Sequence, residues 1–229
     1  MPSFDVALRA GASGAIVALI GALIAGRLRR RDVRVAYTRK VFHFVVFTAA
    51  AGVHLAWGPP GAVAYGTVLA AVVLFAVARG EGNLLYDVMA REKDAPHQTL
   101  FILVPMITTA VGGLAAAWIT GPFAVVGYLA AGWGDAAGEP AGARFGKHPY
   151  SVPSLAGVHA TRTLEGSAAV WIFATLGSAV ALGAVGGIPW WGAPMCGTVA
   201  AIVEAGSNHG LDNLTVQLVP SLVAWTVFG

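Results

Sequence analysis

The segment that decides the fold runs from Leu100 to Ile119 and reads LFILVPMITTAVGGLAAAWI. It carries no charge, and about 20 apolar residues are what a helix needs to cross the hydrocarbon core of a bilayer. The whole chain has the same character, because 57% of its 229 residues are hydrophobic, 11% are charged and the mean hydropathy is +0.71. Soluble domains carry roughly 25% charged residues. The composition therefore excludes a soluble globular domain, a disordered chain and a disulfide scaffold, and it predicts a polytopic membrane protein.

Eight segments of the chain are apolar enough to be membrane-spanning helices. We expect an all-α integral membrane protein with seven or eight transmembrane helices, in a single transmembrane domain over residues 1–229. Within it, the N-terminal span at 1–38 is weakly separable from a catalytic helical bundle at 39–229. The positive charges from Arg27 to Arg31 follow the first apolar run, which argues against a cleavable signal peptide. The expected spans are 5–26, 41–57, 61–78, 100–119, 122–138, 167–187, 189–204 and 213–228.

Charge divides the connections between these segments into two sets. One set holds 13 of the 14 lysines and arginines, Arg9 being the exception, and the other set holds no charged residue. The positive-inside rule predicts that the first set faces the cytoplasm and that both termini lie outside. We expect a multi-pass protein, in the cytoplasmic membrane if it is prokaryotic, with catalytic loops facing the cytoplasm. The first set is 27–40, 79–99, 139–166 and 205–212, and the second is 58–61, 120–122 and 186–194.

The loop at 80–98 has apolar residues at helical spacing between charged ones. They are Leu84, Leu85, Val88 and Met89. This pattern predicts a short interfacial helix, and a solvated loop is the alternative.

Ionisable residues gather near the predicted cytoplasmic ends of the spans. Because an ionisable group in hydrocarbon costs about 2.5 kcal/mol or more, we expect these groups to line a cavity that water reaches. Their position argues against a transporter with a midplane site and favours an enzyme that takes one reactant from the lipid and one from the cytosol. Arg39, Lys40 and His43 form the first cluster, within one turn of a helix. The alternative is a pair of snorkelling cations beside an interfacial histidine.

A second cluster places two carboxylates inside an apolar span. Asp135 and Glu139 are four residues apart on one helix face, and two such carboxylates repel unless a cation lies between them. Mg²⁺ prefers carboxylate, water and phosphate oxygens. The surrounding glycines would let backbone approach a ligand, or they would form a helix-packing face with a carboxylate paired to Arg144. These glycines are Gly132, Gly134, Gly138, Gly142 and Gly146.

A third cluster, Thr161 to Ser167, precedes the sixth span. Hydroxyls and backbone N–H groups at a helix N-terminus form an anion site, and Arg162 would add a charge-assisted phosphate contact. Simple N-capping by Thr163 or Ser167 explains the pattern equally well.

A fourth cluster, Glu204 to Asn213, lies between the last two spans. Two acids, two amides and His209 within ten residues are more than a turn requires. The alternative is a turn in which Gly210 and Asn213 supply the backbone geometry and a cap.

Four motifs follow one another in the chain and carry a family resemblance. They are Arg39-Lys40-x-x-His43, then Gly134-Asp135-Ala136-Ala137 with Arg144-Phe145-Gly146-Lys147, then Thr163-Leu164-Glu165-Gly166-Ser167, then Glu204 with Gly210-Leu211-Asp212-Asn213-Leu214-Thr215. In this order they resemble the CTP-dependent lipid kinases, the family of dolichol kinase, phytol and farnesol kinases and the CTP-dependent diacylglycerol kinase. CDP-diacylglycerol synthase is more distantly similar. Many members have lysine at the place of Arg162, and arginine keeps the charge.

The resemblance implies transfer of the γ-phosphate of CTP, or of another nucleoside triphosphate, to the hydroxyl of an isoprenoid alcohol. The alcohol would be phytol, farnesol, geranylgeraniol or a polyprenol of the dolichol type, and Mg²⁺ would be the cofactor. Asp135, Asp212 and His43 would be catalytic, with the general base left open among them. The metal ligands would be Asp135, Glu139, Glu204 and Asp212. Substrate and nucleotide would be bound by Arg39, Lys40, Arg144, Lys147, Arg162, Thr163, Glu165, Gly166, Ser167 and Asn213.

Other functions stay open at this stage. A CDP-lipid synthase of the phosphatidate cytidylyltransferase type and a diacylglycerol kinase are the nearest alternatives, and a lipid transporter is the most distant. The expected partners are the lipid alcohol, the nucleotide and membrane lipids, and a homodimer is left open. The net charge of +3 is too small to indicate nucleic acid, and the single cysteine, Cys196, excludes an intrachain disulfide.

Overall fold

The computed structural model describes residues 3–31, 33, 35–91, 94–154, 160–187, 189–208 and 210–229. Helices make up nearly all of its regular structure, as expected for apolar segments that must satisfy their backbone hydrogen bonds internally. The helices are α1 (Phe4–Arg29), α2 (Val35–Arg79), α3 (Leu84–Asp87), α4 (Leu100–Thr120), α5 (Ala124–Phe145), α6 (Leu164–Val185), α7 (Gly192–Gly206) and α8 (Asp212–Phe228). A short antiparallel pair, β1 (Pro149–Val152) and β2 (Ala160–Thr163), lies between α5 and α6.

Helix α2 consists of two helices joined at Gly58. This residue has φ 63° and ψ −161°, a backbone conformation that favours glycine, and Pro59 and Pro60 then start the second helix. The Tyr65 hydroxyl donates to the Val46 carbonyl at 2.8 Å, so the two halves run back along each other. They correspond to the predicted spans 41–57 and 61–78.

A similar reversal joins α4 to α5. Gly121 has φ 58° and opens the short 3-10 turn η2 (Gly121–Phe123). The Tyr128 hydroxyl donates to the Gly113 carbonyl at 2.8 Å and ties the two helices together. The break falls where the predicted spans 100–119 and 122–138 separate.

Within the described part of the chain, four helical stretches are long and apolar enough to cross a membrane. They are Phe4–Leu28, Tyr37–Arg79, Leu100–Phe145 and Leu164–Val185. The second and third have 43 and 46 residues, and each contains one of the glycine reversals. Helices α7 and α8 have 15 and 17 residues. The all-α membrane class is confirmed, while the count of seven or eight crossings and the cytoplasmic face remain predictions.

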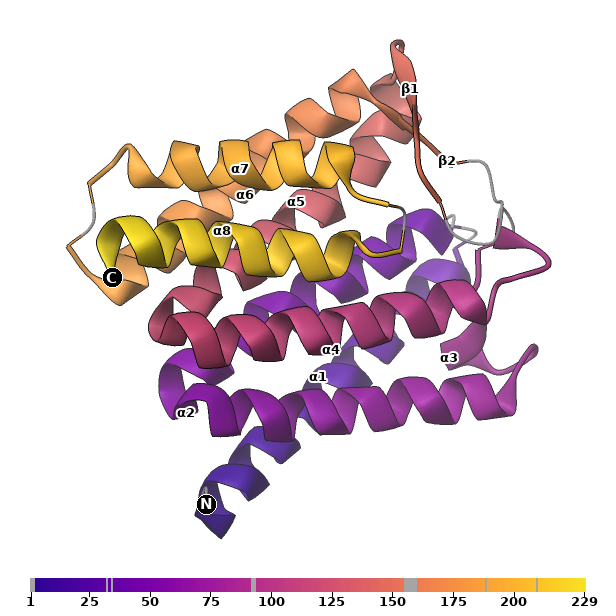
Figure 1. Ribbon diagram of the computed structural model, residues 1–229. Helices are drawn as coiled ribbons and strands as arrows, with labels where there is room; N and C mark the ends of the chain where they lie inside the picture. Colours follow the sequence, from indigo (N-terminus) through magenta and orange to yellow (C-terminus); the bar gives the residue numbers. More distant parts are fainter. Residues whose placement is uncertain are drawn as a thin grey trace.

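Helix α5 lies at the centre of the bundle. Every residue from Ala124 to Gly132 is buried, and α5 packs against α2, α6 and α8. In Figure 1 the connections between elements gather at two ends. The β1–β2 pair, α3 and the α7–α8 turn lie at one end, and the turns after Gly58 and Thr120 lie at the other. The charged connections predicted from the sequence therefore share one end of the molecule.

Two local features differ from the sequence prediction. The expected interfacial helix at 80–98 is reduced to a single turn, α3, which is capped by the Asn83 side chain accepting from Leu85 N at 3.0 Å. The β1–β2 pair was not predicted, because strands of four residues carry too few alternating positions to give a signal.

Candidate active site

Lys40 connects α2 to α5 through two carboxylates. Its ammonium lies 2.6 Å from Asp135 Oδ1 and 3.2 Å from Glu139 Oε2, and its side chain is only 6% exposed. His43 is one turn further along α2, with Nε2 3.3 Å from Asp135 Oδ2. The cation expected between the two α5 carboxylates is thus a lysine of the chain itself.

Arg91 extends this first charge cluster from the loop that follows α3. Its guanidinium contacts Asp94 Oδ2 at 2.6 Å and Glu139 Oε1 at 3.4 Å. Burial by itself lowers the pKa of Arg91, but the charges of Glu139 and Asp94 outweigh it and raise the pKa above its ordinary value. Arg91 therefore stays charged and fastens the loop to α5.

Arg162 organises a second charge cluster at the start of α8. Its Nε lies 2.9 Å from Glu204 Oε1, and its Nη2 lies 2.8 Å from Asp212 Oδ2. It also donates to the carbonyls of Glu204 and Ser207. One guanidinium thus holds β2, the end of α7 and the start of α8 together, which uses the forked donor geometry that lysine lacks.

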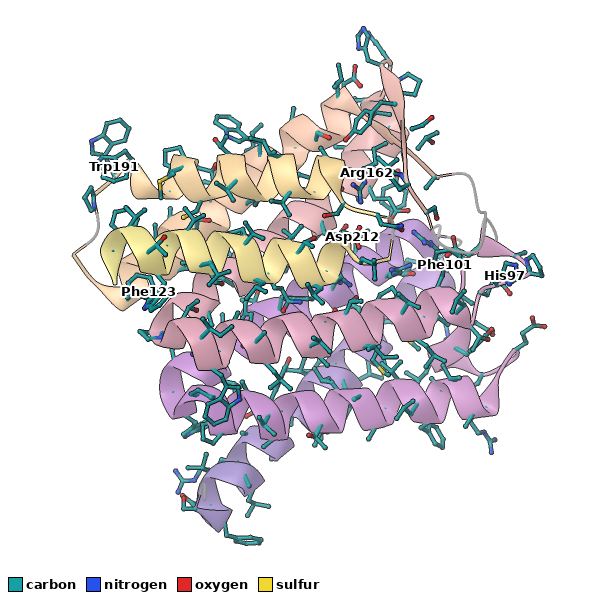
Figure 2. All side chains as sticks on the ribbon, in the orientation of Figure 1. His97, Phe101, Phe123, Arg162, Trp191 and Asp212 are labelled. Atoms are coloured by element: carbon teal, nitrogen blue, oxygen red, sulfur yellow. The ribbon has the colours of Figure 1, made fainter. Side chains whose placement is uncertain are left out.

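The two charge clusters adjoin each other at one end of the bundle. His43, which contacts Asp135, and Asn213, which follows Asp212 in the chain, line the same cavity. Figure 2 places Arg162, Asp212 and Phe101 toward this end, whereas Phe123 and Trp191 lie toward the opposite one. Residues from α2, α5, β2, α7 and α8 therefore converge, as the four sequence motifs predicted.

An apolar cavity of about 330 Å³ lies beside the clusters. Both halves of α2, with α4, α5 and α8, supply its walls, and most of its lining is apolar. Arg39, His43 and Asn213 also line it. His43 contacts Asp135, and Asn213 follows Asp212 in the chain. The cavity thus has a polar end that touches both clusters.

Several buried polar atoms at this end lack a hydrogen-bond partner among the described residues. They are Arg39 Nη1, Glu204 Oε2 and Asn208 Oδ1. Leaving such a group unsatisfied costs about 1–3 kcal/mol. Unpaired polar atoms also occur at His54, Ser154, Thr175 and Ser178, but those at this end of the bundle are available to a polar ligand in the site.

The third sequence motif is used mainly for capping. Thr163 is the N-cap of α6, and its hydroxyl accepts from Gly166 N at 3.1 Å. Glu165 bonds His148 Nδ1 at 2.7 Å, and the Ser167 hydroxyl lies 2.7 Å from Tyr150 OH. The capping alternative is therefore observed, and the phosphate-binding role of these residues stays a prediction.

The glycines of α5 pack against neighbouring helices. A Cβ at Gly138 would lie 2.5 Å from Val170 Cγ2, and one at Gly142 would lie 2.9 Å from Thr163 Oγ1. Gly134 and Gly146 likewise face α6 or its N-cap, and Gly132 faces Phe47. The prediction that these glycines admit a ligand is replaced by their alternative, a helix-packing face.

Arg144 and Lys147, expected to bind nucleotide, lie exposed at the end of α5. The Arg144 guanidinium lies 5.5 Å from the centre of the Phe145 ring, and no carboxylate of the described residues forms the suggested ion pair with it. Both residues are accessible from the charged end of the bundle. His209, part of the fourth motif, lies outside the described residues.

The donors present fit Mg²⁺ best at Glu204 and Asp212. These carboxylates lie close together on one guanidinium, and Glu204 Oε2 is buried with no hydrogen-bond partner among the described residues. Asp135 and Glu139 likewise share one cation, the Lys40 ammonium, but within the described ranges neither has such a buried unpaired oxygen. Within the described ranges no three His, Cys, Asp or Glu side chains form a metal-binding group, but Mg²⁺ commonly takes one or two carboxylates and completes its shell with water and phosphate.

Comparison with curated proteins reveals a relative of this chain. It is 34% identical over 106 residues to the phytol kinase of Synechocystis sp., and the match covers 45% of this chain and 43% of that protein. The matched region thus spans less than half of the curated relative. No protein-family model and no solved structure matches the chain. This curated homologue supports the resemblance of the chain to the prenol kinases over the matched part.

Two site residues were missed by sequence reasoning. Arg91 belongs to a charged loop of the sequence. It pairs with Glu139, 48 positions further along the chain, and no local pattern predicts a contact over that separation. Gln217 lines the cavity and donates to the Asn213 carbonyl. A polar side chain one turn after Asn213 in an apolar span was a signal that could have identified it.

Proposed function

We propose that this protein is a membrane-embedded kinase that transfers the γ-phosphate of CTP to the hydroxyl of an isoprenoid alcohol. The observation that carries the proposal is the apolar cavity whose polar end touches both charge clusters. A lipid alcohol placed there would have its tail among the helices and its hydroxyl beside Arg39, His43 and Asn213. The relation to a phytol kinase supports the same class of substrate.

Phosphoryl transfer depends on positioning and on neutralising charge. Arg39 has a buried Nη1 without a partner among the described residues, so it is suited to hold a phosphate oxygen at the polar end of the cavity. Arg162 would hold the Glu204 and Asp212 carboxylates in place. Mg²⁺ held by Glu204 and Asp212 would offset the negative charge of the phosphates.

The alcohol proton needs an acceptor near the cavity. His43 lines the cavity and lies 3.3 Å from Asp135, whereas Asp135 and Asp212 are not part of the lining. We therefore assign His43 as the base and Asp135 as the group that orients it. The alcohol oxygen forms a bond to the γ-phosphorus, the bond from that phosphorus to the β–γ bridging oxygen breaks, CDP leaves, and the proton passes to His43.

The substrate test is a panel of reactions in proteoliposomes. Phytol, farnesol, geranylgeraniol, a long polyprenol and diacylglycerol are each combined with γ-labelled CTP, ATP or GTP. We expect label in the lipid fraction with isoprenoid alcohols and CTP. Label in diacylglycerol alone would overturn the isoprenoid assignment, and transfer from ATP but not CTP would overturn the nucleotide.

A further inference from the structure

The cavity reaches the outer surface of the bundle along one side. Most of its lining residues are buried or half-buried, and the exposed ones are confined to two short stretches. These are Val63, Gly66 and Thr67 on the second half of α2, and Ala110 and Leu114 on α4. The second half of α2 runs beside α4 in Figure 1, and α2 and α4 are in contact. The exposed lining therefore marks a gap between these two helices.

Small side chains keep this gap open. A Cβ added at Gly66 would meet no atom within 4 Å, and Ala110 is the exposed lining residue nearest the middle of α4. The Thr67 hydroxyl donates to the Val63 carbonyl at 2.8 Å. The gap therefore presents no unpaired donor to hydrocarbon, as a surface in contact with lipid tails requires.

The polar end of the cavity is covered by protein instead. Met89, from the loop after α3, lines the cavity. Arg91 fastens that loop through Glu139 and Asp94, and Tyr86 OH lies 2.9 Å from Thr99 Oγ1. An apolar tail entering from this end would have to pass the charge clusters, which is unfavourable.

We infer that the gap between residues 63–67 and 110–114 is a lateral opening through which the lipid alcohol enters from the bilayer. The far end of a long tail stays outside this opening. The chemical identity of the lipid rests on the proposed function. The cavity of about 330 Å³ is at the lower end of the roughly 300–1,000 Å³ usual for ligand pockets. A long polyprenyl tail exceeds it, and the opening lets the remainder lie among membrane lipids.

The test compares Gly66→Trp with the matched variant Gly52→Trp. Gly52 is also an exposed glycine of α2 whose Cβ would meet nothing within 4 Å, but it does not line the cavity. We expect Gly66→Trp to lower kcat/KM for geranylgeraniol about tenfold and to affect the short alcohol geraniol much less, while Gly52→Trp changes neither. Equal effects of the two variants, or equal losses for both alcohols, would overturn the opening.

A second readout does not depend on turnover. An alcohol with a diazirine at the distal end of its prenyl chain is photoactivated in proteoliposomes, and the labelled peptides are mapped. Labelling of 63–67 and 110–114 in the wild type, with a decrease in Gly66→Trp, supports the opening. If Gly66→Trp does not fold, Ala110→Trp takes its place. Labelling elsewhere overturns it. If labelling appears here but no phosphate is transferred, the proposed function fails and the opening stands.

Discussion

At the level of single residues, the Lys40 ammonium shows how long-range contacts pair the charged groups of the site. Helical spacing places Asp135 and Glu139 on one face of α5, and this pair was predicted. Their partner comes from 95 residues earlier in the chain, and no local pattern specifies a contact over that separation. Sequence therefore identified most charged groups of the candidate site, Arg91 being an exception, but not how they pair.

Replacing Lys40 by methionine should destabilise the protein. Two nearly buried carboxylates would lose their shared cation, and breaking a buried ion pair costs about 3–5 kcal/mol. Thermal unfolding in detergent should show a clearly lower midpoint, part of which returns when Asp135→Asn is added. The control is Arg9→Gln, whose pair with Asp5 is 65% and 61% exposed and is worth about 0–1 kcal/mol. Equal midpoints for Lys40→Met and Arg9→Gln would contradict the structural role.

At the level of elements, glycines determine how closely the helices pack. A Cβ at Gly127 of α5 would overlap the Gln217 carbonyl of α8, and the Gly127 amide donates to Ser221 Oγ at 3.1 Å. A Cβ added at the exposed Gly183 of α6 would meet no atom within 4 Å. The two glycines look alike in sequence, and only the tertiary packing separates them.

Alanine at these two glycines should have opposite effects. Gly127→Ala must push α8 away from α5 and should cost about 1–3 kcal/mol. Gly183→Ala removes an exposed helical glycine and should stabilise by about 0.5–1 kcal/mol. Unfolding midpoints measured side by side check this, and a Gly127→Ala protein as stable as Gly183→Ala would refute the close packing of α5 on α8.

Element boundaries show which parts of the fold are readable from sequence. The eight apolar segments correspond to α1, the two halves of α2, α4, α5, α6, α7 and α8, because hydrophobic length is a strong signal. The uncharged connections at 58–61 and 120–122 coincide with the Gly58 and Gly121 reversals. The β1–β2 pair was not predicted because its strands are too short to give a pattern, and the helix predicted within 80–98 is only the single turn α3.

At the level of the whole molecule, the charge of the connections between helices distinguishes the two ends of the bundle. The described parts of the charged connections lie at the end that holds both clusters, while the uncharged turns lie at the other (Figure 1). The positive-inside rule predicts that the clusters face the cytoplasm. A site on that side would be accessible to a water-soluble nucleotide.

Single cysteines test this orientation in intact cells. In a Cys196→Ala background, Trp190→Cys at one end and Glu81→Cys at the other are both exposed. A membrane-impermeant maleimide should label Trp190→Cys from outside, and Glu81→Cys only after permeabilisation. The reverse pattern, or labelling of both from one side, would invalidate the topology.

The central claim is that the polar end of the cavity moves the γ-phosphoryl group of CTP onto a lipid hydroxyl. The most direct measurement supplies CTP carrying different labels at the α and γ phosphorus to wild type and to Asp212→Asn in proteoliposomes with phytol. We predict γ label without α label in the lipid. For folded Asp212→Asn, we predict a fall in transfer of about 10²–10³-fold, comparable to the loss of an electrostatic catalytic group. Appearance of α label in the lipid, or wild-type transfer by Asp212→Asn, would contradict the account.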